Sequence, residues 1–144
     1  GASGPCCVGF LCGAIIWLNL EKTRPLGHFD TDFFLYYEDD DLTLRAFNQQ
    51  IPMLLIPTIT AQHRSRGSVK GKAPLKAEYI RGYFHARSKI QFTAKHMGSG
   101  AARRLHLKTW ALAVLSIGLR LLWPSPKHMA RNWGRIVGLS RPVQ

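Results

Sequence analysis

Four consecutive acidic residues, Glu38 to Asp41, form the stretch of this sequence best suited to chemistry. They directly follow the apolar run 33–37. A carboxylate can act as a general base by taking a proton from a hydroxyl group as that group attacks. Acidic residues are also typical of a helix N-terminus, because the helix dipole stabilises negative charge there. Neighbouring like charges raise the pKa of a carboxyl group and a helix N-terminus lowers it, so both a reactive site and a solvated helix start stay open.

A histidine and a basic loop come later in the chain, and both can contact charged ligands. His63 ends an apolar segment, and residues 64–76 carry five bases, among them Arg64 and Arg66. Arginine makes bidentate contacts with phosphate groups, and Tyr37 can stack on a sugar ring. Each residue has a plainer alternative, namely a structural histidine at a strand end, a solvated loop, and a tyrosine packed in the core.

The elements around the acidic run follow from the apolar pattern and its breaks. We expect a helix from about residue 41 to 49, ended by Pro52, in which Leu42, Arg45, Ala46 and Gln49 fall three or four positions apart. A short buried strand is expected at 53–56 and a second extended piece at 59–62. The apolar run 8–20 is too short to span a membrane and suits a buried strand or a pair of strands.

The second half of the chain reads as helical. Residues 77–97 predict a helix with aromatic and basic side chains on different faces, broken by the glycines at 98 and 100. The run 105–123 is the most apolar stretch. From Pro124 onward the chain is basic, carries three prolines and is expected to be only partly ordered.

Composition narrows the class of protein. The chain has 144 residues, 46% of them hydrophobic, which fits one globular domain or part of one. Three cysteines crowded into positions 6–12 make a poor disulfide framework, so we expect a reducing compartment, and no pair at zinc spacing is present. The net charge is +12, with two bases and seven acids in residues 1–41 and eighteen bases with one acid in residues 42–144. This asymmetry points to phosphate or anionic lipid as a neighbour.

An ordered set of residues runs through positions 13–63: Gly13-Ala14, then Gly27-x-Phe29-Asp30-x-x-Phe33-Phe34-x-Tyr36-Tyr37-Glu38-Asp39-x-Asp41-Leu42-x-Leu44-Arg45, then Pro57 and His63. The set resembles the acceptor half of glycosyltransferase family 2, most closely its bacterial rhamnosyltransferase-like branch. The resemblance extends into the aromatic and basic stretch 83–96. His28 stands where that family commonly has a second glycine, and Gln50 stands where a glycine usually ends the helix after the acidic motif.

The resemblance implies an α/β fold class, namely the C-terminal part of a GT-A (Rossmann-like) glycosyltransferase fold followed by amphipathic helices. Residues 1–100 would form the acceptor half and residues 101–144 a basic, apolar helical tail. The donor half, with its Asp-x-Asp motif, would lie outside this chain. We therefore expect a fragment that is inactive alone.

The implied reaction is an inverting transfer of a sugar from a nucleotide-sugar donor to a cell-envelope polysaccharide or lipid-linked acceptor. By the resemblance Asp39 is the catalytic base, with Glu38 and Asp41 completing the acidic motif and Asp41 orienting the acceptor or capping the helix. His63 would join the Asp-x-Asp ligands of a divalent metal, Mn²⁺ or Mg²⁺. Arg64, Arg66 and Tyr37 would contact substrate.

The tail suggests a location. Two bases interrupt the run 105–123, which favours an interfacial helix over a spanning one and predicts attraction to an anionic membrane surface. We expect the cytoplasmic face of the cell membrane, with peripheral or C-terminal anchoring; a core or partner-binding helix is the alternative. Two further functions remain open, a basic nucleic-acid-binding module and a non-catalytic glycosyltransferase remnant. Nucleic acid is not the expected partner, because it leaves residues 33–45 unexplained.

Overall fold

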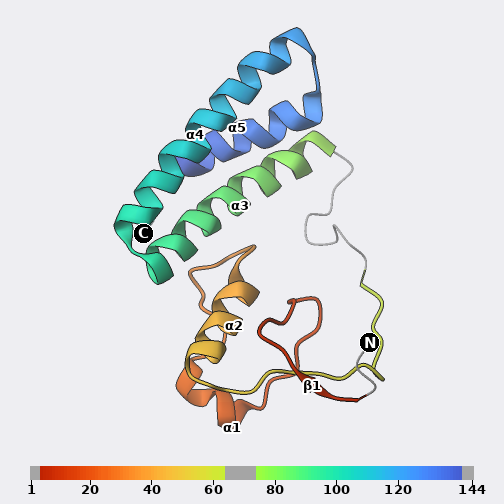
Figure 1. Ribbon diagram of the computed structural model, residues 1–144. Helices are drawn as coiled ribbons and strands as arrows, with labels where there is room; N and C mark the ends of the chain where they lie inside the picture. The colour runs from red at the N-terminus through yellow and green to blue at the C-terminus, as the bar shows by residue number, and fades with distance from the viewer. Residues whose placement is uncertain (1–3, 64–73, 141–144) are drawn as a thin grey trace. The chain divides into compact units, whose positions relative to one another are not determined.

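The computed structural model describes residues 4–63 and 74–140 of the chain (Figure 1). The elements, in chain order, are β1 (Cys6–Cys7), α1 (Leu20–Thr23), the 3-10 helix η1 (Arg24–Leu26), α2 (Glu38–Asn48), β2 (Leu54–Leu55), α3 (Pro74–Met97), α4 (Ser99–Leu122) and α5 (Pro126–Ser140). They form two compact units that divide between residues 65 and 66. The boundary expected at residue 100 falls in the first turn of α4, and both α3 and α4 belong to the second unit.

The first unit is built around one face of α2. Its buried apolar residues are Leu26, Leu42, Ala46 and Met53. Partly buried side chains pack against this cluster from segments before and after α2. They are Val8, Leu11 and Leu18, which precede α2, and Ile51, which follows it. The core of the unit therefore lies between α2 and the irregular segments that precede and follow it.

Helix α2 confirms the predicted helix after the apolar run, but it begins three residues earlier than expected. All four acidic residues lie in its first turn, where the helix dipole favours negative charge. The helix is followed by Gln50, whose φ of 56° is left-handed. This conformation stops the helix two residues before Pro52, because a left-handed residue cannot continue the right-handed hydrogen-bond pattern.

The predicted α/β fold is wrong. Among the described residues the chain is mostly helical, and its strands β1 and β2 form a two-stranded antiparallel sheet that pairs Cys6 with Leu55 and Cys7 with Leu54. A parallel Rossmann-like sheet needs several longer strands joined by crossover helices. The expected strand at 53–56 shrinks to two exposed residues, and 59–62 is not a strand.

The apolar run 8–20 explains much of this error. Its residues do not form the predicted strand, and Val8 adds one backbone hydrogen bond to Met53 beyond the sheet. Leu11 and Leu18 pack on α2 while Trp17 is 91% exposed. Apolar content alone cannot distinguish a buried strand from an irregular segment that covers a helix, so the run was misassigned.

The second unit contains the helices α3, α4 and α5, which lie side by side in Figure 1. The predicted helix at 77–97 is confirmed and begins at Pro74. Gly98 takes a φ of 87° and separates α3 from α4, as the glycine break predicted. The expectation of a partly ordered tail is wrong for residues 126–140, which form α5.

Close contact with α3 accounts for the order of α5. A Cβ atom added at Gly134 would lie 2.1 Å from the Tyr79 carbonyl oxygen, and one at Gly82 would lie 2.0 Å from that of Arg131. Only glycine allows two helix backbones to approach so closely. Glu78 of α3 also accepts from the Arg131 Nε at 2.7 Å. These long-range contacts were not visible in the local composition of the tail.

Helix α4 is long and apolar enough to cross a membrane by length and composition. It has 24 residues, with a mean hydropathy of 1.4 over its most apolar window. Most of its large apolar side chains are exposed, in contrast to those of a core helix.

Candidate functional site

The acidic first turn of α2 presents its carboxylates to different surroundings. Successive residues of a helix are rotated by about 100°, so Asp39 and Asp41 lie on different sides of α2. Asp39 contacts the Gly13 loop, whereas Asp41 contacts Arg45. The predicted catalytic set is thus brought together on one turn, but its members do not share one environment.

Asp39 is held by two backbone N–H groups. The Gly13 N–H donates to Oδ2 at 2.7 Å, and the Asp40 N–H donates to Oδ1 at 3.0 Å. A Cβ atom at position 13 would lie 3.0 to 3.2 Å from three atoms of Asp39. Glycine at position 13 therefore lets the loop backbone approach the carboxylate. Hydrogen bonds of this kind fix the orientation of a carboxylate.

Asp41 is a buried member of the site. Its side chain is 0% exposed and its Oδ2 accepts from the Arg45 Nε at 2.8 Å. Arg45 also donates to the carbonyl oxygens of Leu26 and His28. The pair therefore joins α2 to the end of η1 and the turn after it. Asp41 therefore helps to hold the site in position, and Arg45 is paired with a residue of the acidic run.

Three other groups at the start of α2, those of Tyr37, Glu38 and Asp40, are partly buried. Glu38 Oε2 is buried without a hydrogen-bond partner among the described residues. Burial raises the pKa of Asp40, and the charge of Asp39 raises it further. Burial also raises the pKa of Tyr37, with the charge of Asp40 adding to the effect. Tyr37 therefore keeps its hydroxyl proton.

The backbone just before the acidic turn is strained. Tyr36 and Tyr37 both have a φ of 68°, which is left-handed. For bulky non-glycine residues this conformation is rare and costs about 1–2 kcal/mol each. Consecutive strained residues persist only where the surroundings fix them, and such strain is concentrated at functional sites.

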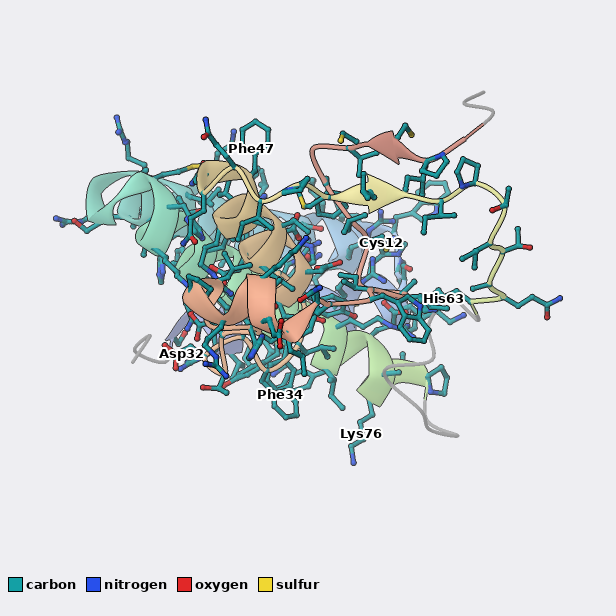
Figure 2. The ribbon with its side chains drawn as sticks, turned by 90° about the horizontal axis from the view of Figure 1, so that it is seen from below. Cys12, Asp32, Phe34, Phe47, His63 and Lys76 are labelled. Carbon is teal, nitrogen blue, oxygen red and sulfur yellow. The ribbon has the colours of Figure 1, made fainter. Side chains whose placement is uncertain are left out.

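The remaining predicted residues lie apart from this turn or outside the described part. His63 is exposed and lies at the end of the segment that leads away from β2 (Figure 2). Arg64 and Arg66 lie outside the described residues. Within residues 4–63 and 74–140, no group of three or more His, Cys, Asp or Glu side chains is placed to hold a metal ion. In the described part of the chain, His63 is therefore not joined by enough acidic, histidine or cysteine side chains to form a metal site.

Sequence reasoning missed two parts of this site. Gly13 entered only as part of a resemblance, and its contact with Asp39, 26 residues away, has no local signal. The pairing of Arg45 with Asp41 has a local signal, because residues four apart meet on a helix surface. The bonds from Arg45 to the carbonyl oxygens of Leu26 and His28 have none.

No protein-family model, no curated protein and no solved structure matches this chain.

Proposed function

We propose that this chain carries the acceptor side of an inverting glycosyltransferase, with Asp39 as the catalytic base. The donor is a nucleotide sugar and the acceptor a cell-envelope polysaccharide or lipid-linked saccharide, as the resemblance to glycosyltransferase family 2 implies. The proposal rests on the local constellation around α2 and not on the predicted α/β fold.

The hydrogen bond from the Gly13 N–H to Asp39 carries the proposal. Gly13 and Asp39 belong to two separate segments of the resemblance, and the fold brings them into contact at 2.7 Å. A carboxylate held by backbone donors keeps further lone pairs for an incoming hydroxyl. A positioned base of this kind is what the transfer requires.

Two departures from the family pattern also support the resemblance. His28 and Gln50 stand where the family commonly has glycine, and they have φ values of 53° and 56°. Glycine is favoured at positions with a left-handed backbone, because it adopts a positive φ without steric cost. The chain thus takes the backbone conformation that those glycines would serve, although its own residues differ.

The proposed step is a direct displacement. The acceptor hydroxyl oxygen attacks the anomeric carbon while its proton passes to an oxygen of Asp39. The bond to the nucleoside diphosphate breaks on the opposite face, so the configuration inverts and the diphosphate leaves with the bonding electrons. Tyr37 would contact the sugar, as the resemblance implies.

The proposal includes a divalent metal and a membrane location. Mn²⁺ or Mg²⁺ would be held by carboxylates outside these residues, with His63 as at most one ligand, so no step is routed through it. Arg64 and Arg66 would contact the diphosphate. The apolar helix α4 supports a membrane location. The cytoplasmic face, where lipid-linked acceptors are presented, is part of the proposal.

A transfer assay on the longest natural polypeptide that contains these residues tests the proposal. Radiolabelled nucleotide sugars are incubated with lipid and polysaccharide acceptors, and transfer is compared between wild type and Asp39→Asn. The substitution keeps the shape of the side chain but removes the base, so transfer should fall about a hundredfold or more. Nucleotide-sugar binding should remain close to that of wild type.

Asp32→Asn is the matched control, because Asp32 is exposed and lies outside the acidic turn. It should transfer at the wild-type rate. Transfer by Asp39→Asn within a few-fold of wild type would remove Asp39 from the role of base.

A further inference from the structure

Helix α4 packs mainly small and polar side chains inward and turns most of its large apolar ones outward. Residues of lower exposure recur every three or four positions along its inner face, among them Ala102, Leu105, Thr109, Ala113, Ser116 and Arg120. Ala113 is 2% exposed, and the Ser116 Oγ accepts from the Asn132 side chain of α5 at 2.7 Å. This face contacts α3 and α5.

The opposite face is formed by large apolar residues. They are Leu107, Trp110, Leu112, Val114, Leu115, Leu119, Leu121 and Leu122, followed by Trp123. Leu122 is 84% exposed and Trp123 is 79% exposed. We call these nine residues the outer face of α4. A contiguous apolar surface of this kind is rare on a protein that faces only water, and it marks a site of contact with another apolar surface.

The packing of α4 argues against a helix that crosses the bilayer. Helices α3 and α5 lie along α4 (Figure 1) and carry ion pairs of Glu78 with Arg81 and Arg131. A spanning α4 would draw these charged helices into the hydrocarbon, where charges are costly. Between Lys108 and Arg120 the helix rises only about 18 Å, roughly three fifths of the thickness of the hydrocarbon core.

The charge of the unit is complementary to anionic lipid. Residues 74–140 contain twelve Lys and Arg residues and one acid, Glu78. Arg103, Arg104 and Lys108 are exposed near the N-terminal end of the outer face, and Lys127 is exposed beyond its other end. Basic residues around an apolar, tryptophan-containing face are typical of helices that lie in the membrane interface.

We propose that the outer face of α4 lies in the plane of an anionic membrane surface, with α3 and α5 on the water side. This inference rests on the membrane location proposed above and adds the surface and the mode of contact. The occupant is the lipid bilayer, because the face combines exposed leucine and tryptophan with flanking cations. The contact is in-plane, because the inward face of α4 is held by α3 and α5.

Binding to vesicles tests the surface. The 144-residue chain is sedimented with vesicles of phosphatidylcholine, with and without phosphatidylglycerol. Leu115→Gln combined with Leu119→Gln should weaken binding roughly tenfold or more, because two apolar side chains no longer enter the lipid. Leu75→Gln combined with Met97→Gln is the matched control, since both residues are exposed on α3. The control should bind as wild type, and circular dichroism verifies that both variants keep their helices.

The depth of Trp110 tests the mode of contact. Trp110 lies near the middle of α4 and is 43% exposed. A variant that keeps only this tryptophan, with Trp17, Trp123 and Trp133 replaced by Phe, is bound to vesicles that carry bromine at shallow or deep acyl positions. An in-plane helix should be quenched most by shallow bromine, whereas a spanning helix should place Trp110 near the midplane and be quenched most by deep bromine.

Each outcome has one meaning. Loss of binding in the α4 variant only, with shallow quenching, supports the proposal. Deep quenching overturns the in-plane mode while leaving the membrane location intact. Equal binding of all variants overturns the outer face as the contact surface. No binding to any vesicle overturns both the inference and the membrane location, but not the sugar transfer, which is assayed separately through Asp39.

Discussion

At the scale of single residues, the contact between Gly13 and Asp39 decides how the candidate base is presented. Both oxygens of Asp39 accept backbone N–H groups, from Gly13 and Asp40. The bond from Gly13 is exposed to solvent, so we expect it to contribute about 0.5–1.5 kcal/mol. Gly13 is therefore predicted to serve both stability and the orientation of the carboxylate.

Gly13→Ala tests this contact. The new Cβ atom would come within 3.0 to 3.2 Å of Asp39, so the loop must shift and the hydrogen bond must lengthen. We expect a loss of about 1–2 kcal/mol in the free energy of unfolding, measured by urea denaturation. Gly9→Ala is the control, because nothing lies within 4 Å of the corresponding Cβ position. Equal effects of the two substitutions would contradict the role assigned to Gly13.

Gln50 carries a backbone cost that glycine would relieve. Its φ of 56° is left-handed, which costs a side-chain-bearing residue about 1–2 kcal/mol. Glycine loses more entropy than glutamine on folding, which offsets part of the relieved strain. We therefore expect Gln50→Gly to stabilise the protein by about 0.5–1 kcal/mol. Gln49→Gly is the control at a φ of −92° and should destabilise it. Thermal melts of both variants measure the difference, and a lower melting temperature for Gln50→Gly would count against the assigned conformation.

At the scale of elements, a buried carboxylate connects α3 to α5. Glu78 of α3 is 8% exposed and pairs with Arg81 of the same helix and Arg131 of α5. Burial raises the pKa of Glu78, but the hydrogen bonds and charges of Arg131 and Arg81 outweigh burial and lower it below its ordinary value. The packing of α5 on α3 therefore depends on the ionised form of Glu78.

This dependence predicts a response to acid. A carboxyl group whose folded pKa lies below its unfolded pKa stabilises the fold above the unfolded value, about 4.3 for glutamate. That stability is lost as the pH falls through the folded pKa. Melting temperatures measured from about pH 7 down to pH 3 should fall more steeply for wild type than for Glu78→Gln, which is less stable at neutral pH. Parallel curves for the two proteins would argue against the ion pairs.

At the scale of the whole molecule, charge divides between the two units. The described residues 4–63 contain three bases and seven acids, whereas residues 74–140 contain twelve bases and one acid. The unit with the candidate carboxylates is thus acidic, and the unit with the exposed apolar helix is basic. A basic, apolar unit suits an anionic surface, while an acidic turn suits proton transfer.

The basic unit predicts a salt-dependent attachment. Binding of the chain to phosphatidylglycerol vesicles should weaken as NaCl rises from about 0.05 to 0.5 M, because salt screens exposed charges. Replacing Arg103, Arg104 and Lys108 by Gln should weaken binding at low salt and flatten this dependence. The same change at Lys22 and Arg24, in the acidic unit, serves as control. An unchanged salt dependence in the triple variant would exclude these three residues from the contact.

The sequence by itself determined the features that local spacing encodes. The acidic run at a helix start, the helix over 77–97 and the break at Gly98 follow from periodicity, dipole and glycine chemistry, which act within a few residues. The tertiary structure decided what depends on distant partners. Val8, Leu11 and Leu18 pack against the buried cluster around α2, and the run 8–20 does not form a strand. Helix α5 is ordered because Gly134 meets the backbone of α3, and Asp39 meets Gly13 across 26 residues. Contacts between residues far apart in the chain produce no periodic pattern in the local sequence. The prediction of fold class, which relied on apolar content, was therefore wrong, whereas the acidic run was correctly expected at the start of a helix.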